Sequence, residues 1–280
     1  FKSLGCDTRK FSWKEYFKHY QYPSRYETDN SKLKSLYYRL QNKFLIGPVI
    51  AKINKDFIKK CEEVKPDLVF IYRGTHIYPE TIQKIKNSNL CKVYGYNNDD
   101  PFSNEYKNYV WRFYKKSIPY YNHIFSYRWK NIEDYRSIGY DKVSLLRSYY
   151  LDKKNFYIEQ PYTNQYECDV VFIGHFEDDG RDEAIKLLLE NGVNLKLYGT
   201  GWEKSSLYDY FIDKFKKIKP VYDDYNIVIN SAKIALVFLS KLNNDTYTRR
   251  CFEIPATKTL MMSEYTDDLT TLFKQSVEAE

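Results

Sequence analysis

The sequence predicts an α/β protein built from two halves, each containing a parallel β-sheet. Two observations lead to this prediction. Short apolar runs alternate with helical stretches, and this alternation stops at about residues 152–166 and then restarts. Parallel strands need a crossover connection, usually a helix, so strands that alternate with helices indicate a parallel sheet. We therefore place one domain at residues 1–160 and a second at residues 161–280.

The first half contains four predicted strands. The run DLVFIY at residues 67–72 is almost continuously apolar, as in a strand buried on both faces. Pro79 suits the first turn of a helix, and Gly139 is a good residue to end one. In chain order, the strands are predicted at residues 67–72, 91–96, 122–126 and 142–146, and the helices at residues 79–86, 104–117 and 130–137.

The second half repeats the pattern with five predicted strands and four intervening crossovers, which together make one Rossmann-like domain. The strands are predicted at residues 169–174, 194–198, 217–221, 234–239 and 259–263, and the helices at residues 181–191, 223–232, 250–256 and 268–274. Both ends of the chain are expected to be incomplete. Residues 1–11 resemble the end of a first helix followed by a second strand, and the strand that should precede that helix is missing.

Composition bounds the class of protein. The longest apolar run, at residues 234–239, is far shorter than the ~20 residues that span a bilayer, and no secretory signal is present. The five cysteines are scattered and form no CxxC pair, which is typical of small core residues in a reducing compartment. We therefore expect a cytoplasmic protein.

The net charge of +7 suits a phosphate-bearing ligand, an anionic membrane surface or nucleic acid. The excess is spread along the chain, so a solvated basic surface explains any single lysine cluster best. No RNA-binding motif accompanies the many aromatic residues, and we expect no nucleic-acid partner. Peripheral contact with a membrane stays open, as does the oligomeric state.

Three segments of the second half resemble the CgeB-like glycosyltransferases of the GT-B superfamily. They are VVFIGHFEDDGRDEAIKLL at residues 170–188, LKLYGTGW at residues 195–202 and TRRCFEIPATKTLMMSEYTDDLTTLF at residues 248–273. The last contains the family's R-x-F-E-x-x-A pattern, although residues 256–258 read ATK where the family has A-x-G. The first half matches more loosely, through KPDLVFIYRG, YNNDDP and SYRWKNIEDYRSIGYDKVSLL.

The resemblance implies two Rossmann-like domains that face each other across a cleft. It also implies transfer of a sugar from a nucleoside-diphosphate sugar to a hydroxyl of a glycan or glycolipid acceptor. We expect no metal ion and no cofactor, the nucleotide sugar being a co-substrate. Two alternatives stay open: a nucleotide-sugar epimerase or hydrolase on the same fold, and a non-catalytic module that binds nucleotide sugars.

Glu253 is the first candidate for donor binding, because a carboxylate at this position can accept hydrogen bonds from both ribose hydroxyls. Arg250 would grip the diphosphate, and Arg181 could reach it from the first loop of the domain. Either arginine could instead pair with neighbouring acids. The remaining donor-binding candidates follow predicted strands or begin helices, where backbone and ligand approach closely: Gly174, Gly199, Gly201, Tyr222, Thr266 and Asp267.

The catalytic candidates lie in the first half. Asp99 or Asp100, in the loop after a strand, could act as a base on the acceptor or stabilise positive charge on the sugar ring. Asp is equally at home as a turn or cap residue. We reject a metal-binding Asp pair, because the single-domain fold that uses it would leave the second half unexplained. His76 is a second candidate base, with a structural role as its alternative.

Overall fold

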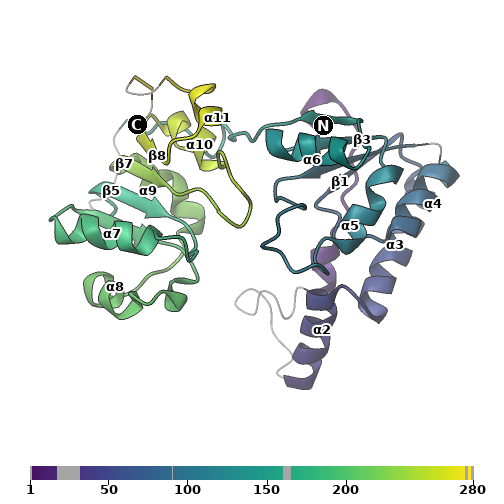
Figure 1. The fold of residues 1–280 in the computed structure, drawn as a ribbon, viewed down its shortest axis with the longest axis horizontal. Helices are drawn as coiled ribbons and strands as arrows, with labels where there is room; N and C mark the ends of the chain where they lie inside the picture. The colour runs from purple at the N-terminus through teal and green to yellow at the C-terminus, as the bar shows by residue number, and fades with distance from the viewer. Residues whose placement is uncertain (1, 18–31, 90, 160–164, 275–276, 279–280) are drawn as a thin grey trace. The chain divides into compact units, whose positions relative to one another are not determined.

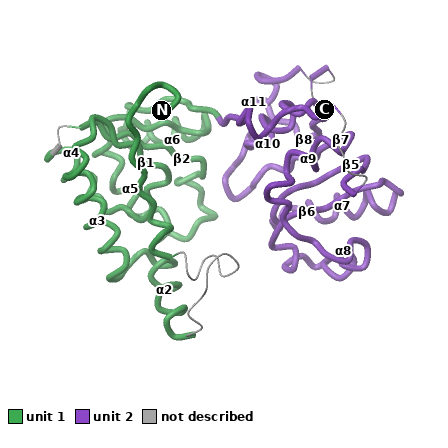
Figure 2. The backbone as a smooth tube through the Cα atoms, turned by 180° about the vertical axis from the view of Figure 1, so that it is seen from behind, with its two compact units in different colours: residues 1–147 green, residues 148–280 purple. Residues whose placement is uncertain are grey.

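A computed structural model of the protein describes residues 2–17, 32–89, 91–159, 165–274 and 277–278. The chain divides into two compact units, Phe1–Arg147 (unit 1) and Ser148–Glu280 (unit 2), which Figure 2 shows in separate colours. The predicted boundary between residues 160 and 161 lies outside the described residues. Each unit contains its own parallel sheet, as predicted.

Unit 1, of which Figure 1 labels β1 and β3, contains a four-stranded parallel sheet with the strand order β1-β2-β3-β4. Its strands are β1 (Leu68–Tyr72), β2 (Lys92–Asn97), β3 (His123–Ser126) and β4 (Val143–Leu145). The connections contain α4 (Pro79–Asn89), α5 (Arg112–Ser117), η3 (Ile118–Tyr120) and α6 (Trp129–Ser137). The chain before β1 forms η1 (Lys2–Leu4), η2 (Trp13–Tyr16), α2 (Lys32–Phe44) and α3 (Pro48–Val64). The four predicted strands are confirmed.

The core of unit 1 lies between one face of the sheet and its helices. When each strand is added on the same side of the previous one, right-handed crossovers place all connecting helices on one face. Accordingly, one hydrophobic cluster joins Val69 and Ile124 of the sheet with residues of α3, α4, α5 and α6. On β1, Leu68, Phe70 and Tyr72 alternate with the buried residues and are exposed. The expectation that residues 67–72 are buried on both faces was therefore wrong for the described part of the chain.

Unit 2 contains a second four-stranded parallel sheet, with the order β6-β5-β7-β8. Its strands are β5 (Cys168–Ile173), β6 (Leu195–Tyr198), β7 (Ala232–Val237) and β8 (Leu260–Ser263). The other elements are α7 (Arg181–Glu190), η4 (Trp202–Lys204), α8 (Tyr208–Phe215), η5 (Tyr222–Asp224), α9 (Tyr225–Asn230), α10 (Arg250–Glu253), η6 (Pro255–Thr257) and α11 (Asp267–Thr270). The chain leaves β5 on one side to form β6 and returns to its other side to form β7. This reversal of strand order is the point at which open α/β sheets bind ligands.

Three predicted segments differ in the structure. Residues 217–221 form no strand: Pro220 lacks a backbone N–H, and the segment touches the sheet through one hydrogen bond, from Gly199 N to Lys219 O (3.2 Å). The helix predicted at residues 104–117 begins only at Arg112, because Asp100 and the residues after it form turns. The strand expected near the end of residues 1–11 is absent too, and this polar stretch lacks the apolar alternation of a strand.

All five cysteines are free thiols; four are buried, as expected of small core residues, and Cys6 is exposed. The helices in the described ranges include none with the length and apolar character that a bilayer-spanning segment requires.

Candidate functional site

The carboxyl edge of the unit 2 sheet brings together the ends of β5, β6 and β7. Gly174 follows β5, and its N–H donates to the carbonyl of Tyr198 at the end of β6 (2.9 Å). Gly199 comes next on β6 with a φ of 145°, and a Cβ atom there would lie 1.7 Å from the carbonyl oxygen of Gly174. Only glycine fits this close approach. The structure thus brings Gly174 and Gly199, which are distant in sequence, into contact.

The loop after β6 continues through Gly201 and Trp202. Gly201 has a φ of 80° and begins η4. Trp202 is buried, and its indole Nε1 donates to the carbonyl of Gly174 (3.0 Å). The indole lies in the core of unit 2 and therefore holds the turn at Gly174 from the core side.

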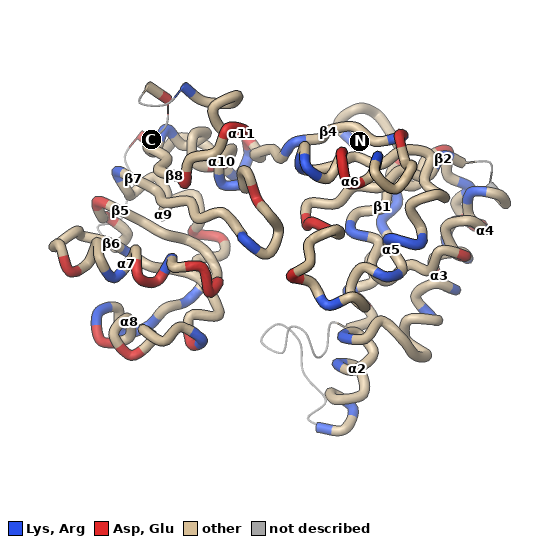
Figure 3. The backbone as a smooth tube through the Cα atoms, viewed as in Figure 1, with Lys and Arg blue, Asp and Glu red and all other residues tan. Residues whose placement is uncertain are grey.

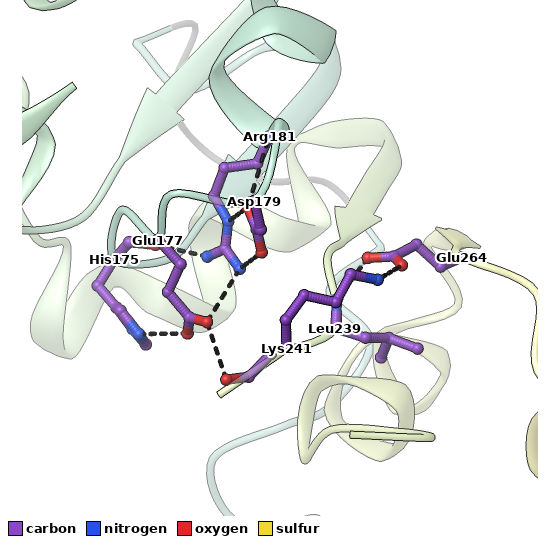
Figure 4. Close-up of polar contacts among 8 residues, drawn as sticks. His175, Glu177, Asp179, Arg181, Leu239, Lys241 and Glu264 are labelled. Carbon is purple, nitrogen blue, oxygen red and sulfur yellow. Dashed lines mark hydrogen bonds and ion pairs between the residues drawn. The ribbon is translucent and has the colours of Figure 1, made fainter. Parts of the chain in front are cut away.

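Arg181 holds the loop between β5 and α7 rather than facing solvent (Figure 4). Its Nε and Nη2 donate to the two carboxylate oxygens of Asp179 (2.8 and 2.6 Å), and its Nη1 donates to the carbonyl of His175 (2.7 Å). The guanidinium is 3% exposed. A bidentate pair of this kind is geometrically specific, so Arg181 is already engaged by a neighbouring acid, which is the alternative that the sequence left open.

Glu177 ties the β5 loop to the loop after β7 (Figure 4). Its carboxylate accepts a hydrogen bond from Ser240 Oγ (2.8 Å) and lies 2.8 Å from Nε2 of the exposed His175. Burial raises the pKa of Glu177, but the hydrogen bonds from His175 and Ser240 and the charge of Arg181 outweigh it, so the pKa lies below its ordinary value. Roles for His175, Glu177 and Ser240 were not predicted from the sequence. His175 directly follows Gly174, which was selected because it follows a predicted strand.

Glu253 lies at the end of the short helix α10. Its carboxylate accepts a hydrogen bond from the hydroxyl of Tyr225 (3.0 Å), the first residue of α9, and lies 2.6 Å from Nε of Arg249. Burial raises the pKa of Tyr225, with Arg250 opposing the rise and Glu253 adding to it, so the hydroxyl stays protonated and donates. The crossovers that contain α9 and α10 both run from the carboxyl edge of the sheet back to its amino edge, and the hydrogen bond from Tyr225 to Glu253 joins the two helices.

Arg250 differs from its neighbour Arg249. The Nε atom of Arg250 is buried and has no hydrogen-bond partner among the described residues. Arg249 pairs with Glu253 and stacks over the ring of Tyr149, 4.9 Å from its centroid. A polar group that is buried without a partner is unfavourable, so Arg250 is the arginine of this site suited to receive an anionic ligand.

The three remaining candidates of unit 2 have different surroundings. Thr266 caps α11: its hydroxyl accepts from Leu269 N (3.1 Å) and donates to the carbonyl of Thr246 (2.7 Å). Asp267 is exposed and accepts from Tyr265 Oη (3.3 Å). Tyr222 is 69% exposed. The Thr266 hydroxyl is thus occupied, whereas the Tyr222 ring can be covered by a ligand.

In unit 1, Asp99 and Asp100 follow β2 but have different roles. Asp100 is fully buried, accepts from Phe102 N (2.8 Å) and Asn131 Nδ2 (2.7 Å), and lies 3.3 Å from Lys130 Nζ. It is therefore the turn residue that the sequence allowed as an alternative. Asp99 lies 3.0 Å from Arg73 Nε, and its side chain is 14% exposed.

His76 is also part of the core of unit 1. Its ring stacks on Trp13 with a centroid distance of 3.7 Å, Nδ1 lies 3.0 Å from Thr75 Oγ1, and Nε2 lies 2.8 Å from Asn42 Oδ1. Burial lowers the pKa of His76 to about 3. Both ring nitrogens have partners, and only 4% of the residue is exposed. His76 therefore has the structural role that the sequence left open and is not an accessible base. In the same described ranges, no cluster of three His, Cys, Asp or Glu side chains is arranged to hold a metal ion.

Comparison with solved structures defines the class of fold. The chain is similar to HepE of Anabaena in complex with UDP and glucose, with a TM-score of 0.61 and 8% identity over 83% of this chain and 67% of that one. It is also similar to a Listeria monocytogenes protein described as a UDP-N-acetylglucosamine 2-epimerase, with a TM-score of 0.52 and 12% identity over 82% of this chain and 67% of that one. Two Rossmann-like parallel-sheet units of this kind are the GT-B architecture.

Within that class, residues 181–280 match the model of a family described as Glycosyl transferase-like. The match begins at α7 and includes Gly199 and the helix α10, which begins at Arg250 and ends at Glu253. A search of the curated proteins found no significant match.

Proposed function

We propose that the protein is a glycosyltransferase that moves a sugar from a nucleoside-diphosphate sugar to a hydroxyl of a glycan or glycolipid acceptor. The observation that carries the proposal is the contact of Gly174 with Gly199 at the strand-order reversal of the unit 2 sheet, and we infer that Arg250 and Glu253 complete the same donor site. Gly199, Arg250 and Glu253 lie within residues 181–280, which match the glycosyl-transferase-like family, whereas Gly174 lies just before that range. The CgeB-like pattern at residues 248–273 belongs to the same proposal.

Each group has a definite task in donor binding. Glu253 is held by Tyr225 and Arg249, so its carboxylate is oriented before the ribose hydroxyls donate to it. Arg250 meets the diphosphate charge. The close contact of Gly174 and Gly199 holds the ends of β5 and β6 together at the proposed nucleotide site. The exposed ring of Tyr222 suits the face of a base.

In the transfer step, the bond between the anomeric carbon and the diphosphate oxygen breaks, and its electron pair leaves with the diphosphate. The acceptor oxygen bonds to the anomeric carbon, and its proton passes to a base. Asp99 is the unit 1 candidate for this base, because Asp100 and His76 are buried and engaged in hydrogen bonds. The Asp99 carboxylate lies 3.0 Å from Arg73 Nε, and this contact holds the side chain in place.

An epimerase acting on a nucleotide sugar is the second candidate. The likeness to the Listeria monocytogenes protein favours it, since that protein is described as a UDP-N-acetylglucosamine 2-epimerase. The same donor site would serve both reactions. Release of free sugar or epimer without transfer to any acceptor would select this alternative.

The test of the donor site uses UDP as its first probe, within a thermal-shift screen of nucleoside diphosphates. Glu253→Gln keeps the size of the side chain and removes its charge, so it should weaken UDP binding by about 1–3 kcal/mol, measured by calorimetry. Glu190→Gln is the matched control, because Glu190 pairs only with Lys186 on the surface of α7. Equal UDP affinity of wild type and Glu253→Gln, with both folded, would remove Glu253 from the site.

A second test concerns metal ions. Because Arg250 and backbone N–H groups are proposed to meet the phosphate charge, turnover of the donor should continue in excess EDTA. The measurement is release of nucleoside diphosphate with and without added Mg²⁺ or Mn²⁺. Strict dependence on either ion would contradict this division of labour and return Asp99 to consideration as a metal ligand.

A further inference from the structure

Helix α2 of unit 1 exposes an apolar stripe. Its members recur every three or four residues, a spacing that places side chains on one face of a helix. Each is between 37% and 80% exposed: Leu33, Leu36, Tyr37, Leu40 and Phe44. Scattered apolar side chains are normal on protein surfaces, whereas a contiguous exposed group marks an interaction site.

Other parts of α2 are anchored to unit 1, so the stripe is held facing outward. Gln41 is buried, and its Oε1 accepts from the backbone N–H of Val49 (2.8 Å). At the end of the helix, Arg112 Nη2 donates to the carbonyl of Phe44 (2.7 Å). Rotation of α2 to hide its leucines would break both contacts and bury charge.

A strip of positive charge runs beside the apolar stripe. Lys32, Arg39 and Lys43 are spaced by seven and four residues, which places them together on the helix surface. No Asp or Glu occurs between residues 32 and 55, and Figure 3 shows α2 with basic residues and no acidic ones. Within the described residues, none of these three cations forms a salt bridge.

We propose that α2 docks the protein on an anionic lipid surface. The leucines and aromatic rings would enter the boundary between head groups and acyl chains, and the three cations would meet lipid phosphates. The charge pattern selects this occupant: an apolar protein partner would be satisfied by the stripe alone, whereas an adjoining strip of cations without acids complements a negative surface. This inference concerns unit 1 and does not depend on the proposed sugar transfer.

Vesicle flotation of the full chain tests the proposal. The protein should bind vesicles in which about a third of the lipid is phosphatidylglycerol, should bind phosphatidylcholine vesicles much less, and should dissociate as salt rises. Leu36→Gln/Leu40→Gln should lower the partition coefficient by about tenfold or more. Arg39→Gln/Lys43→Gln should lower it by about tenfold or more on anionic vesicles only.

Leu187→Gln provides the matched control, because Leu187 is 61% exposed on α7 of unit 2 and lies outside the stripe. Circular dichroism and an unchanged unfolding transition of unit 1 verify that the α2 variants are folded. Wild type that ignores anionic vesicles, or α2 variants that bind as wild type does, would overturn the proposal. So would a wild-type dimer in ultracentrifugation that Leu36→Gln/Leu40→Gln converts to monomer, because a second copy would then occupy the stripe.

Discussion

At the scale of single residues, buried polar side chains hold the loops that follow the strands. In unit 2, Arg181 donates two hydrogen bonds to Asp179, and in unit 1, Asp100 accepts hydrogen bonds from Phe102 N and Asn131 Nδ2. Because each of these groups is buried with its partners, removal of one partner leaves an unsatisfied charge, which is costly. Each carboxylate oxygen of Glu253 likewise has a partner, in Tyr225 and Arg249. Arg250 differs, because its buried Nε has no hydrogen-bond partner among the described residues.

His76 should make the stability of unit 1 sensitive to acid. Its pKa of about 3 in the folded protein lies below the ordinary value near 6.5, so the unfolded chain binds a proton that the folded chain excludes. The stabilisation is complete above about pH 6.5 and is lost as the pH falls toward 3, by up to about 1.4 kcal/mol for each pH unit. Urea unfolding of wild type and His76→Gln at pH 7.5 and 5.5 measures this.

His76→Gln should be less stable at neutral pH, because it loses the stack on Trp13, but it should lose less stability on acidification. His175→Gln is the control, since His175 is exposed. The same loss between the two pH values in His76→Gln and wild type would show that another group is responsible.

At the scale of elements, the turn between β6 and η4 determines the shape of the carboxyl edge of the unit 2 sheet, where we propose that the donor binds. Gly199 donates to Lys219 O, and its own α-carbon lies against the carbonyl of Gly174. The irregular segment at residues 217–221 is thereby attached to the sheet end without becoming a strand.

Gly199→Ala should disrupt this turn, because the new methyl group would overlap the Gly174 carbonyl and force the backbone apart. We expect unit 2 to lose about 2 kcal/mol or more, and UDP binding to weaken with it. Gly192→Ala is the matched control: Gly192 also has a positive φ, of 78°, but nothing lies within 4 Å of its would-be Cβ. It should lose only about 1–2 kcal/mol and keep UDP affinity. Equal effects of the two substitutions in unfolding and binding assays would contradict this account.

At the scale of the whole molecule, the chain consists of two compact units with separate sheets and separate hydrophobic cores. The topologies of the units differ. The unit 1 strands follow in simple order, whereas the unit 2 sheet reverses around β5 and so has the ligand-binding switch point.

Calorimetry should therefore resolve two unfolding transitions. UDP should raise the midpoint temperature of the unit 2 transition and leave that of the unit 1 transition unchanged, because a ligand stabilises only the unit that binds it. Acidification from pH 7.5 to 5.5 should lower the midpoint temperature of the unit 1 transition more in wild type than in the His76→Gln variant. A single transition that UDP raises as a whole would show that the units unfold together.

The sequence alone determined the two parallel sheets, since continuous apolar runs between helical stretches have few other solutions. It also selected the strand ends at Gly174 and Gly199 and the helix of Arg250 and Glu253 as places for a ligand. It did not separate Asp99 from Asp100 or predict the exposed face of β1, because both depend on which neighbours pack against the residue.

Only the tertiary structure decided which polar groups are already engaged. Arg181 and His76 look like ligand-binding or catalytic residues in the sequence. In the fold, however, Asp179 pairs with Arg181, while Trp13 stacks on the His76 ring and Asn42 lies within hydrogen-bond distance of it. Conversely, no element was predicted at residues 32–44, and only the structure shows that α2 forms there with its leucines outside and Gln41 inside. The physical reason is that periodicity and composition fix which face of an element is apolar, whereas the partner that satisfies each face comes from chain segments far away in the sequence.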